Sequence, residues 1–124
     1  MTANRVLCVE DDEDTRDMLK MMLGYSDFEA AVAPDADAAL GLMGRERFSL
    51  YILDGGLRNV KGLSLCEQIR DADARTPIVI FSGNGYASDI EAGMLAGANA
   101  YLVKPDSSEL IPTIRRLLLE AAAG

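Results

Sequence analysis

The stretch that most constrains the fold is Ser49–Asp54, an apolar run that ends on an aspartate and is followed by two glycines. Short apolar runs without alternating polar residues are typical of strands in parallel sheets, because helices cover both faces. Aspartate is rare inside strands, so we expect Asp54 at the carboxyl end of this strand, where open α/β sheets bind their ligands. The alternative is a turn-forming aspartate before the two glycines.

Apolar runs of the same kind recur along the chain and predict five strands in all. These are Arg5–Val9, Phe28–Ala33, Ser49–Asp54, Ile78–Phe81 and Ala100–Val103. Each strand is followed by a segment with apolar residues at helical spacing, which predicts five helices. The alternation favours an α/β fold, a doubly wound five-stranded parallel sheet with five helices on both faces. Right-handed crossovers leave few strand orders, and we expect the flavodoxin-like order 2-1-3-4-5.

Local signals place several of the helix ends. Gly24 is expected to end the first helix, and Pro34-Asp35 to begin the second. The sequence Asp106–Glu109 is a candidate capping box for the last helix, although Pro112 predicts an irregular start. Gly93 should soften the fourth helix, Ala87–Ala96, since glycine costs about 1 kcal/mol relative to alanine.

Length and charge exclude several classes of function. We expect one domain over residues 1–124, because 124 residues suffice for a single core. The 20 Asp and Glu against 12 Lys and Arg give a net charge of −8, which argues against direct nucleic-acid binding and favours a cation ligand. The absence of histidine excludes a histidine nucleophile or general base, and it removes the commonest zinc ligand.

Location follows from what the sequence lacks and from its cysteines. No apolar stretch reaches the roughly 18 residues of a membrane helix, and the first residues do not resemble a signal peptide. We therefore expect a cytoplasmic protein without membrane contact. Cys8 and Cys66 lie in apolar patterns, which predicts two buried, reduced thiols rather than a disulfide or a metal pair.

Five polar residues fall at the carboxyl ends of predicted strands. Glu10 and Asp11 follow the first strand, Asp54 ends the third, Ser82 follows the fourth and Lys104 follows the fifth. In the expected strand order the first and third strands are neighbours, so the three acids should lie together. Clustered carboxylates repel one another, and either one is protonated or a cation binds between them. An oxygen-only site of this kind suits Mg²⁺.

The acidic run itself has a second interpretation. Acids at the start of a helix complement its dipole, and this explains Asp12, Glu13 and Asp14 better than a metal does. For Glu10 and Asp11, at the end of the strand, we favour the metal. An aspartate beside a divalent cation, an ammonium and a hydroxyl can accept a phosphoryl group as a nucleophile.

These residues and their spacing resemble a response-regulator receiver domain of two-component signalling, similar to the chemotaxis regulators. Four segments in order, spanning nearly the whole chain, carry the resemblance. They are the acidic signature Val9–Asp12, the phosphoacceptor at Leu53-Asp54, the hydroxyl of Ser82 and the closing signature Gly97–Pro105.

The resemblance implies a phosphorelay function with Mg²⁺ as cofactor. Asp54 would accept a phosphoryl group from the phosphohistidine of a sensor kinase or phosphotransfer protein. Asp11, Asp54 and the Gly56 carbonyl would bind Mg²⁺ directly, with Glu10 acting through water. Such a domain would catalyse only its own phosphorylation and dephosphorylation.

The resemblance also implies how the signal leaves the site. Ser82 and Lys104 would bind the phosphate, Tyr101 would be the aromatic switch residue, and Lys104-Pro105 would be a cis peptide. The face formed by the fourth helix, fifth strand and fifth helix would then contact a downstream protein or output domain.

Departures from the family pattern leave an alternative open. Arg58 stands where the family usually has proline, and Gly55-Gly56 replace bulkier residues, which predicts a looser loop from Asp54 to Gly62. A degenerate receiver that binds proteins without phosphorylation is therefore the alternative. An aspartate-nucleophile phosphatase would need a second acid at Gly56, and a flavin carrier would need a Ser/Thr-rich loop after the first strand.

Overall fold

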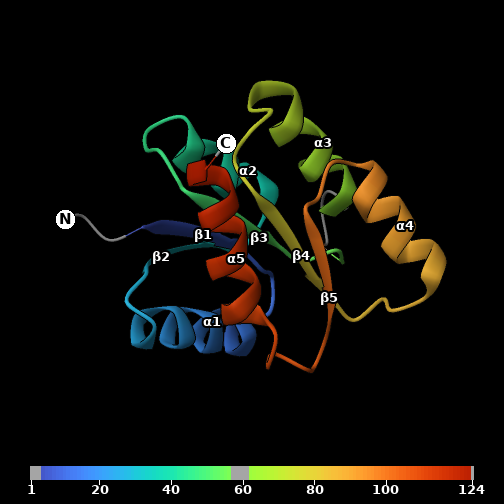
Figure 1. Cartoon of the computed structure of the whole chain (residues 1–124), viewed down its shortest axis with the longest axis horizontal. Helices are drawn as coiled ribbons and strands as arrows, with labels where there is room; N and C mark the ends of the chain where they lie inside the picture. Colours follow the sequence, from blue (N-terminus) through green and yellow to red (C-terminus); the bar gives the residue numbers. More distant parts are fainter. Residues whose placement is uncertain (1–3, 57–61, 124) are drawn as a thin grey trace.

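A computed structural model describes residues 4–56 and 62–123, in which five strands alternate with five helices (Figure 1). The elements in order are β1 Arg5–Val9, α1 Glu13–Tyr25, β2 Glu29–Ala33, α2 Ala36–Met43, β3 Leu50–Leu53, α3 Gly62–Ala72, β4 Ile78–Ser82, α4 Ala87–Leu95, β5 Ala100–Val103 and α5 Leu110–Ala123. The predicted strands and helices are therefore present. Arg58 and most of the loop expected to be loose lie outside the described residues.

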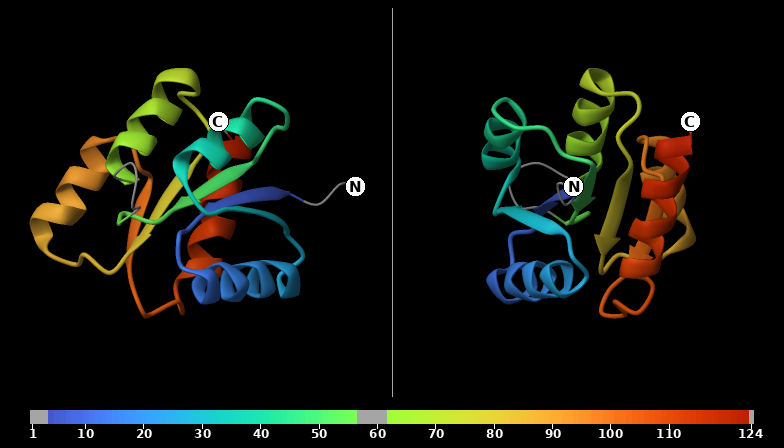
Figure 2. Two further views of the ribbon diagram at one scale, coloured as in Figure 1. Left: turned by 180° about the vertical axis from the view of Figure 1, so that it is seen from behind. Right: turned by 60° about the vertical axis from the view of Figure 1, so that its left-hand side comes forward.

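The strands form one sheet in the order β2-β1-β3-β4-β5, with every pair parallel. This confirms the predicted doubly wound α/β fold. Figure 2 shows the sheet between two layers of helices. One layer is α1 and α5, and the other is α2, α3 and α4, so each face of the sheet has a core of its own.

The continuous apolar runs are explained by these two cores. Along β1, Val6 and Cys8 pack toward α1 and α5, whereas Leu7 and Val9 pack toward α2 and α3. Every residue of β3 and β4 is buried. A fully buried aliphatic side chain contributes about 1.5 to 3 kcal/mol, so the central strands supply much of the stability.

Both cysteines are buried free thiols, as predicted. Burial, together with the nearby Glu10 carboxyl, raises the pKa of the Cys8 thiol to about 12. The Cys8 thiol is therefore protonated at neutral pH and unreactive.

Two predicted helix ends are wrong. Gly24 does not end α1, which continues to Tyr25 with Ser26 as its C-cap. Asp27 takes the left-handed conformation there, with φ of 67°, and its amide donates to the Gly24 carbonyl. Aspartate tolerates this conformation better than most residues, so no glycine is needed.

The start of α5 also differs from the predicted capping box. The Asp106 carboxylate accepts the Ser108 amide at 2.9 Å, which closes a turn before the helix begins at Leu110. Pro112 is then the third helical residue, where its missing N–H has no intrahelical acceptor to lose. Pro112 therefore fits the first turn of α5, and the irregular start expected from it stays a prediction. The predicted start of α2 is confirmed, because Asp35 caps the helix through the Ala38 amide.

Within residues 4–56 and 62–123, no helix has the length and apolar character needed to cross a membrane.

Candidate functional site

Strands β1 and β3 end side by side and bring three carboxylates together. Val9 pairs with Leu53, and the Asp54 amide donates to the Val9 carbonyl at 2.9 Å. Carboxylate oxygens of Glu10, Asp11 and Asp54 all lie within 4.8 Å of one another. The topology thus produces the acidic cluster that the strand order predicts.

Lys104 extends from the end of β5 into this cluster. Its Nζ forms an ion pair and hydrogen bond with Glu10 Oε1, and it lies 3.4 Å from Asp54 Oδ1. The ammonium also sits 5.6 Å from the centroid of the Phe81 ring. One cation is therefore shared by two buried acids, with its closer contact to Glu10 rather than to Asp54.

The pKa values of Glu10 and Asp54 are shifted in opposite directions. Glu10 is only 1% exposed, and burial, reinforced by the Asp54 carboxylate, raises its pKa to about 7. Burial alone would also raise the pKa of Asp54, but the Glu10 carboxyl, the Gly56 amide and the Lys104 ammonium lower it below the usual value. Asp54 is therefore ionised at neutral pH, as a nucleophilic carboxylate must be.

The donor set fits a hard divalent cation. Glu10 Oε2 is buried and lacks a hydrogen-bond partner among the described residues, which is costly for a carboxylate oxygen. Mg²⁺ is usually bound directly by one or two carboxylates and keeps several waters. Two of the three clustered acids can therefore bind it directly, and the third can act through a bound water. The Gly56 amide donates to Asp54 Oδ1 at 3.0 Å, while the predicted role of the Gly56 carbonyl stays a prediction.

Asp12 is used differently from its neighbours in the acidic run. Its carboxylate caps α1 by accepting the Thr15 amide at 2.9 Å and the Thr15 hydroxyl at 2.6 Å. Glu13 and Asp14 lie in the first turn of the same helix. This agrees with the helix-terminus interpretation of these three acids.

Ser82 ends β4 beside the loop that follows Asp54. Its hydroxyl is buried and accepts the Asn84 amide at 3.2 Å. A Cβ at Gly55 would lie 2.8 Å from Ser82 Oγ, and one at Gly62 would lie 2.3 Å from the Asp54 carbonyl oxygen. These two glycines therefore allow other atoms to pack closely around Asp54.

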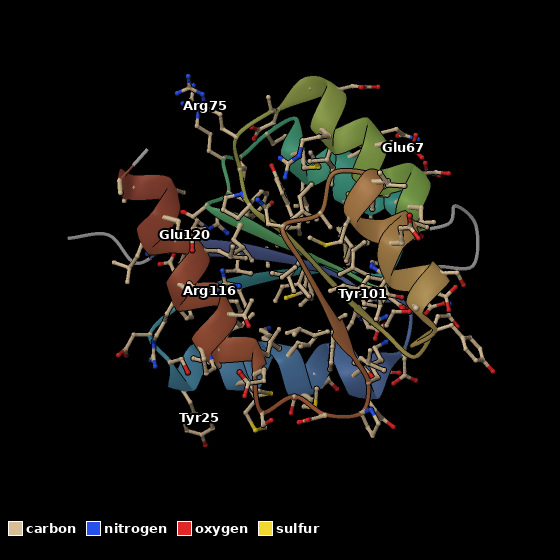
Figure 3. The ribbon with its side chains drawn as sticks, turned by 45° about the vertical axis from the view of Figure 1, so that its right-hand side comes forward. Tyr25, Glu67, Arg75, Tyr101, Arg116 and Glu120 are labelled. Carbon is tan, nitrogen blue, oxygen red and sulfur yellow. The ribbon has the colours of Figure 1, made fainter. Side chains whose placement is uncertain are left out.

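Tyr101 is the second residue of β5. It pairs with Ile80, and Val103 is the residue opposite Ser82. Its ring lies between β5 and α4 (Figure 3), and its hydroxyl donates to the Asn84 carbonyl at 2.6 Å. Asn84 thus accepts from Tyr101 and donates to Ser82, which links the two residues through one loop residue.

Two contributors to the site escaped prediction, namely Asn84 and Arg16. Asn84 acts through its backbone, and in the sequence it is one of several turn residues. Arg16 Nη1 donates to the Glu10 and Asp11 carbonyls at 3.1 and 3.2 Å, although nothing in its helical pattern marks it. Lys104-Pro105 is a cis peptide, as expected.

A family model described as the response regulator receiver domain matches residues 6–115. The chain belongs to this family. Similar proteins include the response regulator MprA of Mycobacterium leprae, 34% identical over 92% of this chain and 50% of the relative. The response regulator ArlR of Staphylococcus epidermidis is 35% identical over 91% of this chain and 52% of the relative. The chain spans about half the length of these curated relatives.

Solved receiver domains share the fold. A CheY-like receiver domain protein from Methanospirillum hungatei has a TM-score of 0.91 at 26% identity, with 98% of both chains covered. The chemotaxis regulator CheY4 of Vibrio cholerae has a TM-score of 0.86 at 27% identity, with 94% of this chain and 99% of that chain covered. The chain is therefore a receiver domain of the response-regulator family, a signalling domain of two-component phosphorelays. Response regulators work with sensor kinases and output domains.

Proposed function

We propose that Asp54 is the phosphoacceptor of this receiver domain and that the phosphoryl donor is a phosphohistidine on a sensor kinase or phosphotransfer protein. The observation that carries the proposal is the position of the Asp54 carboxylate, which lies 3.4 Å from the Lys104 ammonium and clusters with the carboxylates of Glu10 and Asp11. An Asp54 carboxylate oxygen bonds to phosphorus while the P–N bond breaks. The electron pair of that bond leaves with the donor imidazole, and an acyl phosphate remains on Asp54.

Residues around Asp54 have distinct roles in this step. Glu10, Asp11 and Asp54 would hold Mg²⁺, which when bound offsets charge on the transferring oxygens. Lys104 Nζ lies 3.4 Å from Asp54 Oδ1 and would bind a phosphate oxygen. To do so, the ammonium would have to move away from the Glu10 carboxylate. The Ser82 hydroxyl, next to Gly55, would donate to a second phosphate oxygen.

We also propose that phosphorylation changes the face formed by α4, β5 and α5, which a downstream protein or output domain would contact. If Ser82 turns toward a phosphoryl group, it gives up the Asn84 amide, and Asn84 also accepts from Tyr101. Tyr101 is therefore the residue through which α4 would sense the change.

Further features support the remaining parts of the proposal. The net charge of −8 favours protein partners over nucleic acid for this domain, and two buried free thiols support a cytoplasmic location. The domain would catalyse only its own phosphorylation and dephosphorylation, because its nucleophile is also the group that is modified.

Acetyl phosphate provides the test, since it donates a phosphoryl group without a protein partner. With Mg²⁺ we expect intact-mass spectrometry to show one phosphoryl group on the unmodified chain and none on Asp54→Asn. Asp12→Asn is the matched control and should still be labelled, because Asp12 caps α1. Labelling of Asp54→Asn, or no labelling of the unmodified chain by several donors, would favour the phosphorylation-independent binding module instead.

A further inference from the structure

The acidic turn between β1 and α1, residues 10–12, is held in place by hydrogen bonds to its backbone groups. The Glu10 amide donates to the Ala33 carbonyl at 3.0 Å, which ties the start of the turn to β2. The next two carbonyls, of Glu10 and Asp11, both accept from Arg16 Nη1, at 3.1 and 3.2 Å. The Asp12 carbonyl accepts the Arg16 amide at 2.9 Å. Arg16 therefore contacts three consecutive carbonyls of the turn.

The half-buried guanidinium of Arg16 is well suited to fix this turn. It is planar and always charged, so one nitrogen can hold two neighbouring carbonyls in a defined orientation. With those carbonyls bound to Arg16, the Glu10 and Asp11 carboxylates converge with Asp54 within 4.8 Å. The Asp12 side chain, bound to Thr15, fixes the other end of the turn.

We propose that Arg16 is a positioning residue for the cation site, holding the turn so that Glu10 and Asp11 meet Asp54 in a geometry that binds Mg²⁺. This inference rests on the proposed function, because it concerns the same three carboxylates. Arg16 itself does not touch the cation. It acts in the way that outer-shell hydrogen bonds orient the groups that ligate a metal.

A purely electrostatic role for Arg16 would have the opposite sign. Its positive charge extends to this turn, since the pKa of Asp12 is lowered chiefly by Thr15 and in smaller part by Lys104 and Arg16. A nearby positive charge repels a divalent cation, so losing the charge alone would strengthen Mg²⁺ binding. Losing the two carbonyl contacts would weaken it. The direction of the change therefore distinguishes the two roles.

Two substitutions separate charge from position. Arg16→Lys keeps the charge, but its side chain is one bond shorter and lacks the planar group, so its ammonium should not reach the position of Arg16 Nη1 between the two carbonyls. Arg16→Met loses both the charge and the contacts while keeping much of the length. If Arg16 positions the turn, both variants should bind Mg²⁺ about tenfold or more weakly, the range seen when residues that orient metal ligands are changed. Lys20→Met removes one charge from an exposed site on α1 and should leave the dissociation constant within about twofold of the unmodified chain.

The measurement is a Mg²⁺ titration of the full chain followed by amide chemical shifts, with thermal melts in Mg²⁺-free buffer to verify folding. If Arg16→Met does not fold, Arg16→Lys alone decides, since charge alone predicts no change for it. Wild-type affinity in Arg16→Lys would overturn the positioning role and leave the proposed function standing. No Mg²⁺ binding by the unmodified chain would overturn both.

Discussion

Gly93 lies inside α4, where a glycine is normally unfavourable, but the close packing of neighbouring side chains requires a residue without a Cβ there. It is buried, and a Cβ there would lie 2.7 Å from Tyr101 Cδ2 and 3.0 Å from Ile80 Cδ1. Glycine lets the Tyr101 ring approach the helix backbone. Gly93 therefore has two effects on α4. It lowers the helix propensity, as expected from the sequence, and it also allows close packing against Tyr101, which the sequence does not reveal.

We predict that Gly93→Ala destabilises the protein despite its better helix propensity. The added methyl should cost about 1 to 3 kcal/mol through overpacking, against a gain of about 1 kcal/mol from propensity, so we expect a net loss of up to about 2 kcal/mol. Gly41→Ala is the matched control, because Gly41 lies in α2 with no atom within 4 Å of its added Cβ. Urea denaturation should show a loss of stability for the first variant and a small gain for the second.

The contact with Tyr101 can be tested separately. In a Tyr101→Ala background the ring is absent, so Gly93→Ala should cost less than it does in the unmodified chain. An equal cost in both backgrounds would assign the strain to Ile80 and refute the role given to Tyr101.

Residue-scale features differ in how far the sequence reveals them. The positions of Glu10, Asp54 and Lys104 follow from strand ends, because parallel strands place those ends at one edge. The closer pairing of Lys104 with Glu10 does not follow, since it depends on side-chain reach and burial. Asn84 contributes through its backbone amide and carbonyl, which every residue has, so residue type could not identify it. Arg16 contributes through its guanidinium, but its acceptors are backbone carbonyls, which no sequence pattern marks.

At the scale of elements, Arg70 connects α3 to the segment after α4 and to the segment before β4, at the sheet edge opposite Asp54. From the last turn of α3 it donates twice to the Gly97 carbonyl after α4, at 3.0 and 2.8 Å. It also donates to the Thr76 carbonyl before β4 at 2.7 Å and to Asn99 Oδ1 at 2.7 Å. Gly97 has φ of 118°, and a Cβ there would lie 2.8 Å from Arg70 Cγ.

We predict that Arg70→Met destabilises the protein by about 2 to 3 kcal/mol, because several carbonyls lose a charged donor. The loss should be largest near the end of α4, so amide exchange at Ala96 and Ala98 should accelerate more than exchange in α1. Arg75→Met, at an exposed position in the next loop, should change stability by no more than about 0.5 kcal/mol. Equal effects of the two substitutions would show that the Arg70 contacts do not anchor α4.

Helix ends were predicted less well than strands, for a physical reason. A strand is indicated by a whole run of apolar residues bounded by turn residues, and all five such runs became strands. A helix end depends on one or two residues and on the conformation of the segment after them. Gly24 has the right conformational freedom for a C-cap, but Asp27 makes the left-handed turn, and β2 then starts at Glu29.

At the scale of the whole molecule, the two ends of α4 are held differently. Its carboxyl end is anchored through Gly97 to Arg70, whereas its amino end joins the loop that contains Asn84, beside Ser82. The residues of that loop, Gly83 to Tyr86, are exposed. A change at Asp54 should therefore displace the amino end of α4 while Arg70 holds the other end in place.

The last prediction follows the signal from Asp54 to Tyr101. A phosphoryl group should draw the Ser82 hydroxyl into a charged hydrogen bond worth about 1.5 to 3 kcal/mol, enough to shift a two-state equilibrium by about 10- to 150-fold. Ser82→Ala should keep the amide shifts that a Mg²⁺–beryllofluoride phosphate mimic causes around Asp54, but lose those in Ala87–Leu95 and at Tyr101. Tyr101→Phe removes only the hydroxyl that donates to Asn84, so it should reduce the shifts in α4 while those at Ser82 persist. If the shifts in α4 survive both substitutions, the signal does not pass through Ser82, Asn84 and Tyr101.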